Sequence, residues 1–355
     1  MVEPMAGLTP LMKRIRDRFR RCREAGSGKE SPLNFWDRTV AQVRRSGGSP
    51  RDVSLPPGVL FFENLYLWER AVMEPISGRR QDTLIDWFWR TYVGKKVEKA
   101  LSVSCGTGYW ERRISSQGYA SAIDAFDASA GVLRWARDLA REKGLSNINY
   151  RQADLNTERL PAGEYDVVVS VAALHHLLDL EHGLDEIRRC LKPGGYLVFD
   201  EYVGPNRMQW SDRALEIVNE ILSFLPARLR VQARHGIIKE REERVAVEKM
   251  KEIDPTEAAR SEDILPLVKE RFERVEVKPY GGALLMPLFM NIIGNFDSRR
   301  PEDRLVLDFC LELEKILLRE KILDPIFVLG VAQKQAGKDG DGSVPVGPTE
   351  TLELL

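Results

Sequence analysis

An apolar run that breaks into a glycine turn, Leu101–Gly108, is the feature of this 355-residue chain that most constrains its fold. The run reads Leu-Ser-Val-Ser-Cys-Gly-Thr-Gly, and it is followed by Asp127, by Asp154 and by Leu-Lys-Pro-Gly-Gly at 191–195. Glycines directly after one strand and carboxylates after the next two are typical of a parallel sheet that binds a nucleotide-like ligand at the carboxyl ends of its strands. The sequence therefore predicts an α/β fold.

Strand and helix signals alternate through the centre of the chain. Strands are expected near 99–104, 120–126, 148–152, 165–171 and 195–201, and helices over 108–117, 129–143 and 181–190. Long charged helices near 211–224 and 237–251 follow, and two more strand-like runs lie at 274–278 and 325–332. Helical crossovers imply parallel strands covered on both faces. We expect a Rossmann-like, seven-stranded, mostly parallel sheet with helices on both faces, N-terminal helices and a helical cap insertion after the fifth strand.

Composition divides the chain into six parts. They are a basic amphipathic extension and linker at 1–50, an aromatic helical segment at 51–96, a ligand-binding core at 97–205, the cap insertion at 206–262, closing helices and the last two strands at 263–335, and a tail at 336–355. The tail is rich in Gly, Asp and Pro, so we expect it to be disordered.

Two segments before the core allow two interpretations each. Residues 8–24 have apolar positions at helical spacing among many Lys and Arg residues, which fits a helix packed on its own domain or a peripheral contact with a membrane or a protein. The aromatic residues at 59–92 favour core packing, and the alternative is that some of the rings cover a ligand.

Charge and cysteine content exclude several classes of protein. With 53 Lys and Arg against 54 Asp and Glu, the net charge of −1 gives no general field for nucleic acid. The four cysteines are scattered, without the paired spacing of a disulfide framework or a zinc site, so a reducing cytoplasm fits. The sequence shows no apolar run of the roughly 20 residues that a transmembrane segment needs. We expect a soluble, cytoplasmic protein.

The glycine turn and the two aspartates are candidate ligand-binding residues. Gly106 and Gly108 let the backbone approach a ligand closely, whereas Glu111 stands where a dinucleotide motif needs its third glycine, which disfavours a nicotinamide cofactor. Asp127 is placed to accept hydrogen bonds from two ribose hydroxyls, and its alternative role is a helix cap. Asp154 is placed to accept from an adenine amine, and its alternative role is a turn carboxylate.

Residues 97–205 resemble the class I S-adenosylmethionine (AdoMet)-dependent methyltransferases. The resemblance is carried, in family order, by Val-Ser-Cys-Gly-Thr-Gly, Phe-Asp-Ala-Ser, Gln-Ala-Asp-Leu, Glu-Tyr-Asp-Val-Val-Val-Ser, Ala-Leu-His-His-Leu and Leu-Lys-Pro-Gly-Gly-Tyr-Leu-Val. It implies AdoMet as the cofactor, bound by Ser104, Gly106, Gly108, Asp127, Asp154, Leu155, Ser170 and Ala172. Two departures are Ser102, where the family usually has an acidic residue, and Ser104, where it usually has a further glycine.

A methyl acceptor would be met by residues after the fourth and fifth strands. His175, His176 and Glu201 are the candidates for a general base, and the alternative for the histidines is that they only shape the pocket or cap a helix. Candidate substrate contacts are Tyr202, Asn206, Arg207, Trp210 and His235, whose rings and amides suit a polar organic molecule. No metal site is expected, because the histidines have no supporting ligands at metal-binding spacing.

The sequence thus favours an AdoMet-dependent methyltransferase that acts on a small-molecule or glycan-type metabolite, with oxygen slightly ahead of nitrogen or carbon. Nucleic-acid amino methylation is disfavoured, because Ser-Val-Ala-Ala-Leu-His-His follows the fourth strand in place of an Asn/Asp-Pro-Pro-aromatic element. The alternatives are a methyltransferase that acts on a protein and a catalytically silent binding or scaffold protein, for which Ser102 and Ser104 are the supporting features.

Overall fold

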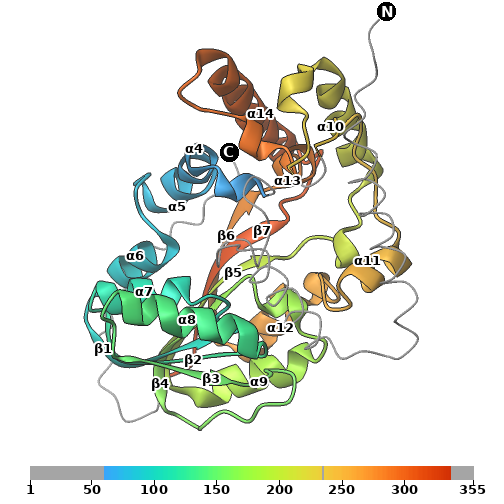
Figure 1. Cartoon of the computed structure of the whole chain (residues 1–355). Coiled ribbons are helices and arrows are strands. Elements are labelled where there is room, and N and C mark those ends of the chain that lie inside the picture. Colours follow the sequence, from blue (N-terminus) through green and yellow to red (C-terminus); the bar gives the residue numbers. More distant parts are fainter. Residues whose placement is uncertain (1–59, 234–235, 337–355) are drawn as a thin grey trace, which may run out of the picture.

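The computed structural model describes residues 60–233 and 236–336, and a single seven-stranded sheet runs through it (Figure 1). The strands are β1 (Val97–Val103), β2 (Ala120–Asp127), β3 (Ile148–Gln152), β4 (Tyr165–Val171), β5 (Leu191–Tyr202), β6 (Arg274–Gly281) and β7 (Phe327–Gln333). Their order across the sheet is β3-β2-β1-β4-β5-β7-β6, and only β7 runs against its neighbours. The expected fold class is confirmed. The predictions for 1–50, for His235 and for the tail from 337 lie outside the described residues.

The central strands are continuous apolar runs because helices cover both of their faces. Five of the seven residues of β4 and of β1 are buried, as expected for parallel strands with two covered faces. Strands β1, β2 and β3 follow one another toward one edge of the sheet, and β4 and β5 follow one another toward the other edge. The direction therefore reverses between β1 and β4, which are neighbours in the sheet. In open α/β sheets this reversal opens a crevice at the carboxyl ends of the strands, where ligands bind.

The helices of the core follow the strands as the sequence predicts. They are α7 (Tyr109–Ser116), α8 (Ala130–Glu142) and α9 (Leu180–Cys190), with α12 (Ile264–Arg271) before β6 and α14 (Pro301–Arg319) before β7. Helices α7 and α8 cover β2 and β3, while α9 and α12 pack against each other beside β5 and β6. In Figure 1, α10 (Asp212–Phe224), α13 (Leu285–Phe289) and α14 gather beyond the β5–β7 end of the sheet.

The insertion after β5 contains less helix than its sequence predicts. Helix α10 agrees with the expected 211–224, whereas the helix expected over 237–251 is wrong except for α11 (Val247–Ile253). The segment before α11 is extended because it is bound to other parts of the chain. Ile238 forms a bridge with Val231, and the buried amino group of Lys239 donates hydrogen bonds to the carbonyl groups of Pro287, Leu288 and Met290.

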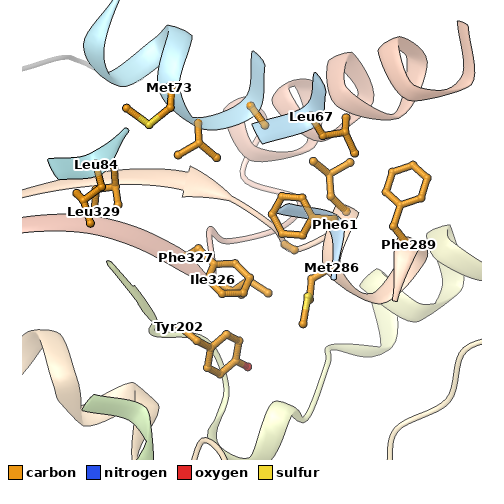
Figure 2. Close-up of a cluster of buried hydrophobic side chains, with 14 of the residues drawn as sticks. Phe61, Leu67, Met73, Leu84, Tyr202, Met286, Phe289, Ile326, Phe327 and Leu329 are labelled. Atoms are coloured by element: carbon orange, nitrogen blue, oxygen red, sulfur yellow. The ribbon is translucent and has the colours of Figure 1, made fainter. Parts of the chain in front are cut away.

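The aromatic segment before β1 forms part of the main hydrophobic core. It comprises η1 (Phe61–Glu63), α4 (Leu65–Leu67), η2 (Trp68–Met73), α5 (Glu74–Ser77), α6 (Leu84–Phe88) and η3 (Trp89–Val93). In Figure 2, Phe61 and Leu67 from its start lie with Met286 and Phe289 of α13 and with Phe327 of β7. The rings of Phe61 and Phe327 meet edge to face, with centroids 6.0 Å apart. Core packing is therefore the observed role of these residues.

The close packing of β5 against β7 leaves no room for a side chain at Gly330. Gly330 pairs with Phe199, and a Cβ atom at Gly330 would lie 2.0 Å from Cζ of that ring. We expect Gly330→Ala to lower the free energy of unfolding by about 1–3 kcal/mol, measured by urea denaturation, because the fully buried Phe199 ring cannot move aside. Adding Phe199→Leu should recover part of that loss. An alanine variant as stable as the parent would contradict this account.

No helix within residues 60–233 and 236–336 combines the length and the apolar character needed to cross a lipid bilayer.

Candidate active site

The loop after β1 holds a strained backbone that a single carboxylate stabilises. Ser104, Gly106 and Gly108 have φ angles of 49°, 54° and 75°, in the left-handed region that favours glycine. The Asp127 carboxylate, at the end of β2, accepts hydrogen bonds from the backbone N–H of Gly106 and of Ser129, both at 2.9 Å. The cap of α8 is Ser129, whose hydroxyl accepts from Val132 N–H. Asp127 is therefore not the cap residue, and it joins the loops that follow β1 and β2.

Beneath the glycine turn lies a buried carboxyl group that the sequence analysis did not place in the site. Glu111, on α7, is fully buried, and none of the described residues gives either of its oxygens a hydrogen bond of ordinary geometry. Burial raises the pKa of Glu111 to about 7, although the nearby Ser102 hydroxyl acts to lower it. The Tyr150 hydroxyl is likewise buried without such a bond, and it would lie 2.4 Å from a Cβ atom at Gly108. Buried polar groups without partners are rare, and those beside a ligand crevice are candidates for a functional site.

The stability of the fold should depend on pH through Glu111. In the unfolded chain a glutamate has a pKa near 4.5, so between about pH 4.5 and 7 the folded state holds a proton that the unfolded state has lost. Stability therefore falls as pH rises through this window. We expect Glu111→Gln to remove about 2–3 kcal/mol of that fall, measured as the difference between urea denaturation series of variant and parent at several pH values.

The comparison with the parent is needed because other buried carboxyls act in the same direction. Burial also raises the pKa values of Asp200 and Glu314 to about 7, so the parent keeps a slope from these two groups. Parallel pH profiles for Glu111→Gln and parent would show that folding does not raise the pKa of Glu111, contrary to this prediction.

Asp154 lies in the turn after β3 and shapes the neighbouring loop. Its Oδ1 accepts from the backbone N–H and from the side-chain amide of Asn156, at 3.0 and 2.8 Å. The Asn156 Oδ1 in turn accepts from the N–H groups of Leu178 and Asp179, ahead of α9. The alternative role of a turn carboxylate is thus observed, and the adenine contact stays a prediction. Leu155 is buried beside it.

The loop after β4 is built around the buried carboxylate of Glu201. Its Oε1 accepts from the N–H groups of Ala173 and Leu174, both at 2.8 Å, and its Oε2 accepts from Nδ1 of His175 at 2.8 Å. Ser170, at the end of β4, lies beside the same carboxylate, and Ala172 adopts a φ of 51° in this turn. Glu201 therefore fixes the loop and orients His175, which is a positioning role.

The two adjacent histidines lie side by side and face a segment of the cap. Their ring centroids are 4.3 Å apart, and Nδ1 of His176 lies 3.0 Å from the Thr256 hydroxyl. Nε2 of His175 and Nε2 of His176 lie 3.8 and 3.9 Å from the two carboxylate oxygens of Glu257. Burial acts to lower the pKa of His175, but the hydrogen bond to Glu201 outweighs burial, and the pKa is raised to about 9. The pKa of His176 is lowered, because the ring is buried and lies beside the charge of His175.

The predicted substrate residues after β5 hold the cap in place. The Tyr202 ring is buried in the core, its hydroxyl donates to the carbonyl of Pro205, and Trp210 packs edge-on against it. Arg207 donates from its guanidinium to the carbonyls of Pro255 and Glu257. Asn206 exchanges hydrogen bonds with Glu262. In the described residues these four side chains thus connect the cap to the sheet, and their contact with a substrate stays a prediction.

The structure brings together one group of predicted residues and adds others that the sequence analysis missed. Glu201, His175 and His176 form one cluster, and Asp127 lies with Gly106 and Gly108 at the glycine turn. The missed residues are Glu111, Asp254, Thr256 and Glu257. The sequence did contain a signal for Glu111. It is an acidic residue in the first turn of α7, and the acidic residue that the family usually has at the position of Ser102 is missing.

Comparison with known proteins matches the central part of the chain. The family described as "Methyltransferase domain" matches residues 101–199. The chain is 30% identical over 174 residues to an uncharacterized protein of Synechococcus sp., which covers 43% of this chain and 40% of that protein. It is also 30% identical over 151 residues to a malonyl-[acyl-carrier protein] O-methyltransferase of Paenibacillus sp., covering 42% of this chain and 52% of the relative.

Other similar proteins differ in the atom that they methylate. A ubiquinone/menaquinone biosynthesis C-methyltransferase of Idiomarina loihiensis is 32% identical over 129 residues, covering 33% of this chain and 49% of the relative. Among solved structures, phosphoethanolamine N-methyltransferase 2 of Haemonchus contortus, in complex with AdoMet, has a TM-score of 0.50 at 16% identity and covers 87% of this chain and 61% of its own, which shows a shared fold. The chain spans about half the length of the curated relatives that it matches.

Proposed function

We propose that this chain, whose residues 101–199 form a methyltransferase domain of the class I AdoMet-dependent family, transfers the methyl group of AdoMet to a hydroxyl of a small-molecule or glycan-type metabolite. One observation carries the proposal. The glycine turn with Asp127 and the His175–His176 pair belong to loops at the carboxyl ends of β1, β2 and β4, where the chain order of the sheet reverses.

The residues at the glycine turn fit the cofactor. A Cβ atom at Gly106 would meet no other described residue within 4 Å, so there is open space beside the turn, and Glu111 provides a buried carboxyl close to that turn. A carboxylate is the group that an ammonium ion such as that of the methionine part requires, and the carboxyl of Glu111 lies beside the hydroxyl of Ser102, where the family's usual acid is missing. Asp127, at the end of β2, is the residue for the ribose hydroxyls.

AdoMet supplies a methyl group on a positively charged sulfur, which is already activated for transfer. The protein's contribution is then to bind the acceptor in line with that methyl group and to exclude water. Ser170 and Ala172 at the end of β4 would border the sulfur, and the loop held by Glu201 would set the position of the acceptor.

The part of the site that would bind the methyl acceptor favours a hydroxyl, because the protein atoms there accept hydrogen bonds. The carboxylate of Glu257 and the Nε2 atom of His176 form a face that accepts hydrogen bonds. Such a face selects a ligand that donates, and a hydroxyl both donates a hydrogen bond and presents a lone pair to the methyl group. The cap segment that carries Glu257 would provide the remaining contacts.

Methyl transfer is tested by incubating the full chain and a metabolite extract with methyl-labelled AdoMet and identifying labelled products by mass spectrometry. A labelled small molecule with the methyl group on oxygen supports the proposal, and a labelled nitrogen, carbon or protein corrects the acceptor. Calorimetry with AdoMet and with its demethylated product should show that both bind. A chain that binds neither is a scaffold protein, and that result rejects the proposal.

A further inference from the structure

We propose that His175, His176 and Glu257 form a binding site for one divalent transition-metal ion of the zinc class. The proposal goes beyond methyl transfer and does not depend on it, because metal binding can be measured on the chain without any methyl acceptor. Two imidazoles and one carboxylate, with a further position open to water or substrate, are the ligands of many catalytic zinc sites. The same set also suits iron(II) and manganese(II).

The three side chains converge from two distant segments of the sequence. His175 and His176 follow β4, and Glu257 lies about 80 residues later in the cap, yet their ligand atoms all lie within 4.8 Å of one another. The two Nε2 atoms lie 3.8 and 3.9 Å from the Glu257 oxygens. Ligand atoms on one tetrahedral zinc ion lie about 3.4 Å apart, given metal–ligand distances of about 2.0–2.2 Å, so small side-chain movements would close the site.

Outer hydrogen bonds engage both Nδ1 atoms, so a metal ion would bind at Nε2 of each ring and would release the Nε2 proton of His175. His175 donates from Nδ1 to the Glu201 carboxylate at 2.8 Å. The Thr256 hydroxyl donates to Asp254 Oδ1 at 2.6 Å, so toward His176 Nδ1, at 3.0 Å, it can only accept. Each histidine thus uses Nδ1 as a donor to an oxygen, which is the arrangement that fixes zinc-binding histidines in proteins.

The charge of the surroundings also favours a cation. Three carboxylates, those of Glu201, Asp254 and Glu257, lie within 4.0 Å of the two imidazole rings. Within residues 60–233 and 236–336, the ion pairs of these three acids are with the two histidines alone. A divalent ion would balance this concentration of negative charge and bring the acceptor atoms of the three ligands together.

The site is also preformed, because its supporting segments are fixed. Glu201, His175 and Thr256 are buried. The guanidinium of Arg207 donates hydrogen bonds to the carbonyls of Pro255 and Glu257, and its backbone N–H donates to the carbonyl of Ala258. A bound ion would leave one coordination position for a ligand, so an acceptor hydroxyl would reach the cluster as an oxygen ligand of the metal.

Zinc binding is tested on the full, untagged chain after treatment with a chelator. Isothermal calorimetry with Zn²⁺ should show a single saturable site per chain. Titration with Co²⁺ should give the visible d–d bands of nitrogen and oxygen ligation, without the near-ultraviolet band that a thiolate ligand would produce. This spectrum separates the proposed site from binding to one of the cysteines.

Three variants and one control locate the ion. His176→Gln and Glu257→Gln each remove a ligand, and we expect each to weaken Zn²⁺ binding by at least about 100-fold; Thr256→Val removes only the outer partner of His176, and about 10-fold weaker binding is expected. The control is His182→Gln, because His182 donates from Nε2 to the carbonyl of Glu158, away from the cluster, and this variant should bind Zn²⁺ as the parent does. Circular dichroism and urea midpoints verify that each variant is folded.

Several outcomes would overturn the proposal. They are the absence of a saturable Zn²⁺ site, a Co²⁺ spectrum with thiolate bands, or unchanged affinity in folded Glu257→Gln protein. Each would leave the three groups as a cluster of charged and polar side chains that holds protons only. Loss of methyl transfer with intact Zn²⁺ binding would count against the proposed function and not against the metal site.

Discussion

Replacing Glu201 by alanine should lower the free energy of unfolding by about 3–5 kcal/mol, the largest effect on stability that we expect from a single side chain in this site. Glu201 is 1% exposed, and its carboxylate accepts from the N–H groups of Ala173 and Leu174 and from Nδ1 of His175. Alanine would leave these donors buried without partners. Urea denaturation monitored by circular dichroism measures the loss.

A matched control separates the stability cost of removing a buried carboxylate from the cost of removing a negative charge. Glu98→Ala removes a carboxylate that is 82% exposed and paired with Lys192, so its cost should stay below about 1 kcal/mol. Glu201→Gln, which keeps the shape and one acceptor oxygen, should fall between the two. A cost for Glu201→Ala no greater than that of the control would mean that the loop after β4 is held by other contacts.

Replacing Asp127 by alanine should weaken AdoMet binding by at least about 100-fold, equivalent to about 3 kcal/mol. The carboxylate holds the glycine turn through Gly106 N–H and the start of α8 through Ser129 N–H, and it is the proposed partner of the ribose hydroxyls. The variant would lose both the shape of the cofactor loop and the ligand contact. Isothermal calorimetry with AdoMet measures the change.

The control for Asp127 is a carboxylate on the next helix. Asp138→Ala, on the exposed side of α8, should leave AdoMet affinity within about 2-fold of the parent, since such surface pairs contribute little. Urea midpoints distinguish loss of the site from loss of the fold. An Asp127→Ala protein that is folded and binds AdoMet within about 3-fold of the parent would remove the basis for placing the cofactor at this edge of the sheet.

The sequence was sufficient for the parts of the structure that depend on local patterns. Strands β1 to β5 and helices α7 to α9 agree with the predicted segments to within a few residues, because alternating apolar runs, turns and glycines determine them locally. Asp127 was recognised from its place after a strand. The parallel pairing of β1 to β5 agrees with the helical crossovers that the sequence predicted between these strands.

Contacts between distant segments could not be predicted in this way. The helix expected over 237–251 is mostly absent because Lys239 binds carbonyl groups near α13, about 50 residues away, and helical periodicity carries no information on that contact. For the same reason Glu257 was not associated with His175 and His176. Tyr202 and Trp210 were assigned to the substrate from their position after β5, but their burial depends on how β7 and the cap pack against them.

The carboxylate of Asp127 has a further consequence for how the cofactor edge moves. Because its two oxygens bind the amides of Gly106 and Ser129, neither amide can exchange its hydrogen with solvent unless the bridge between the two loops is disturbed. The loops should therefore open in one cooperative event, and a molecule that secures one of them will slow exchange in both.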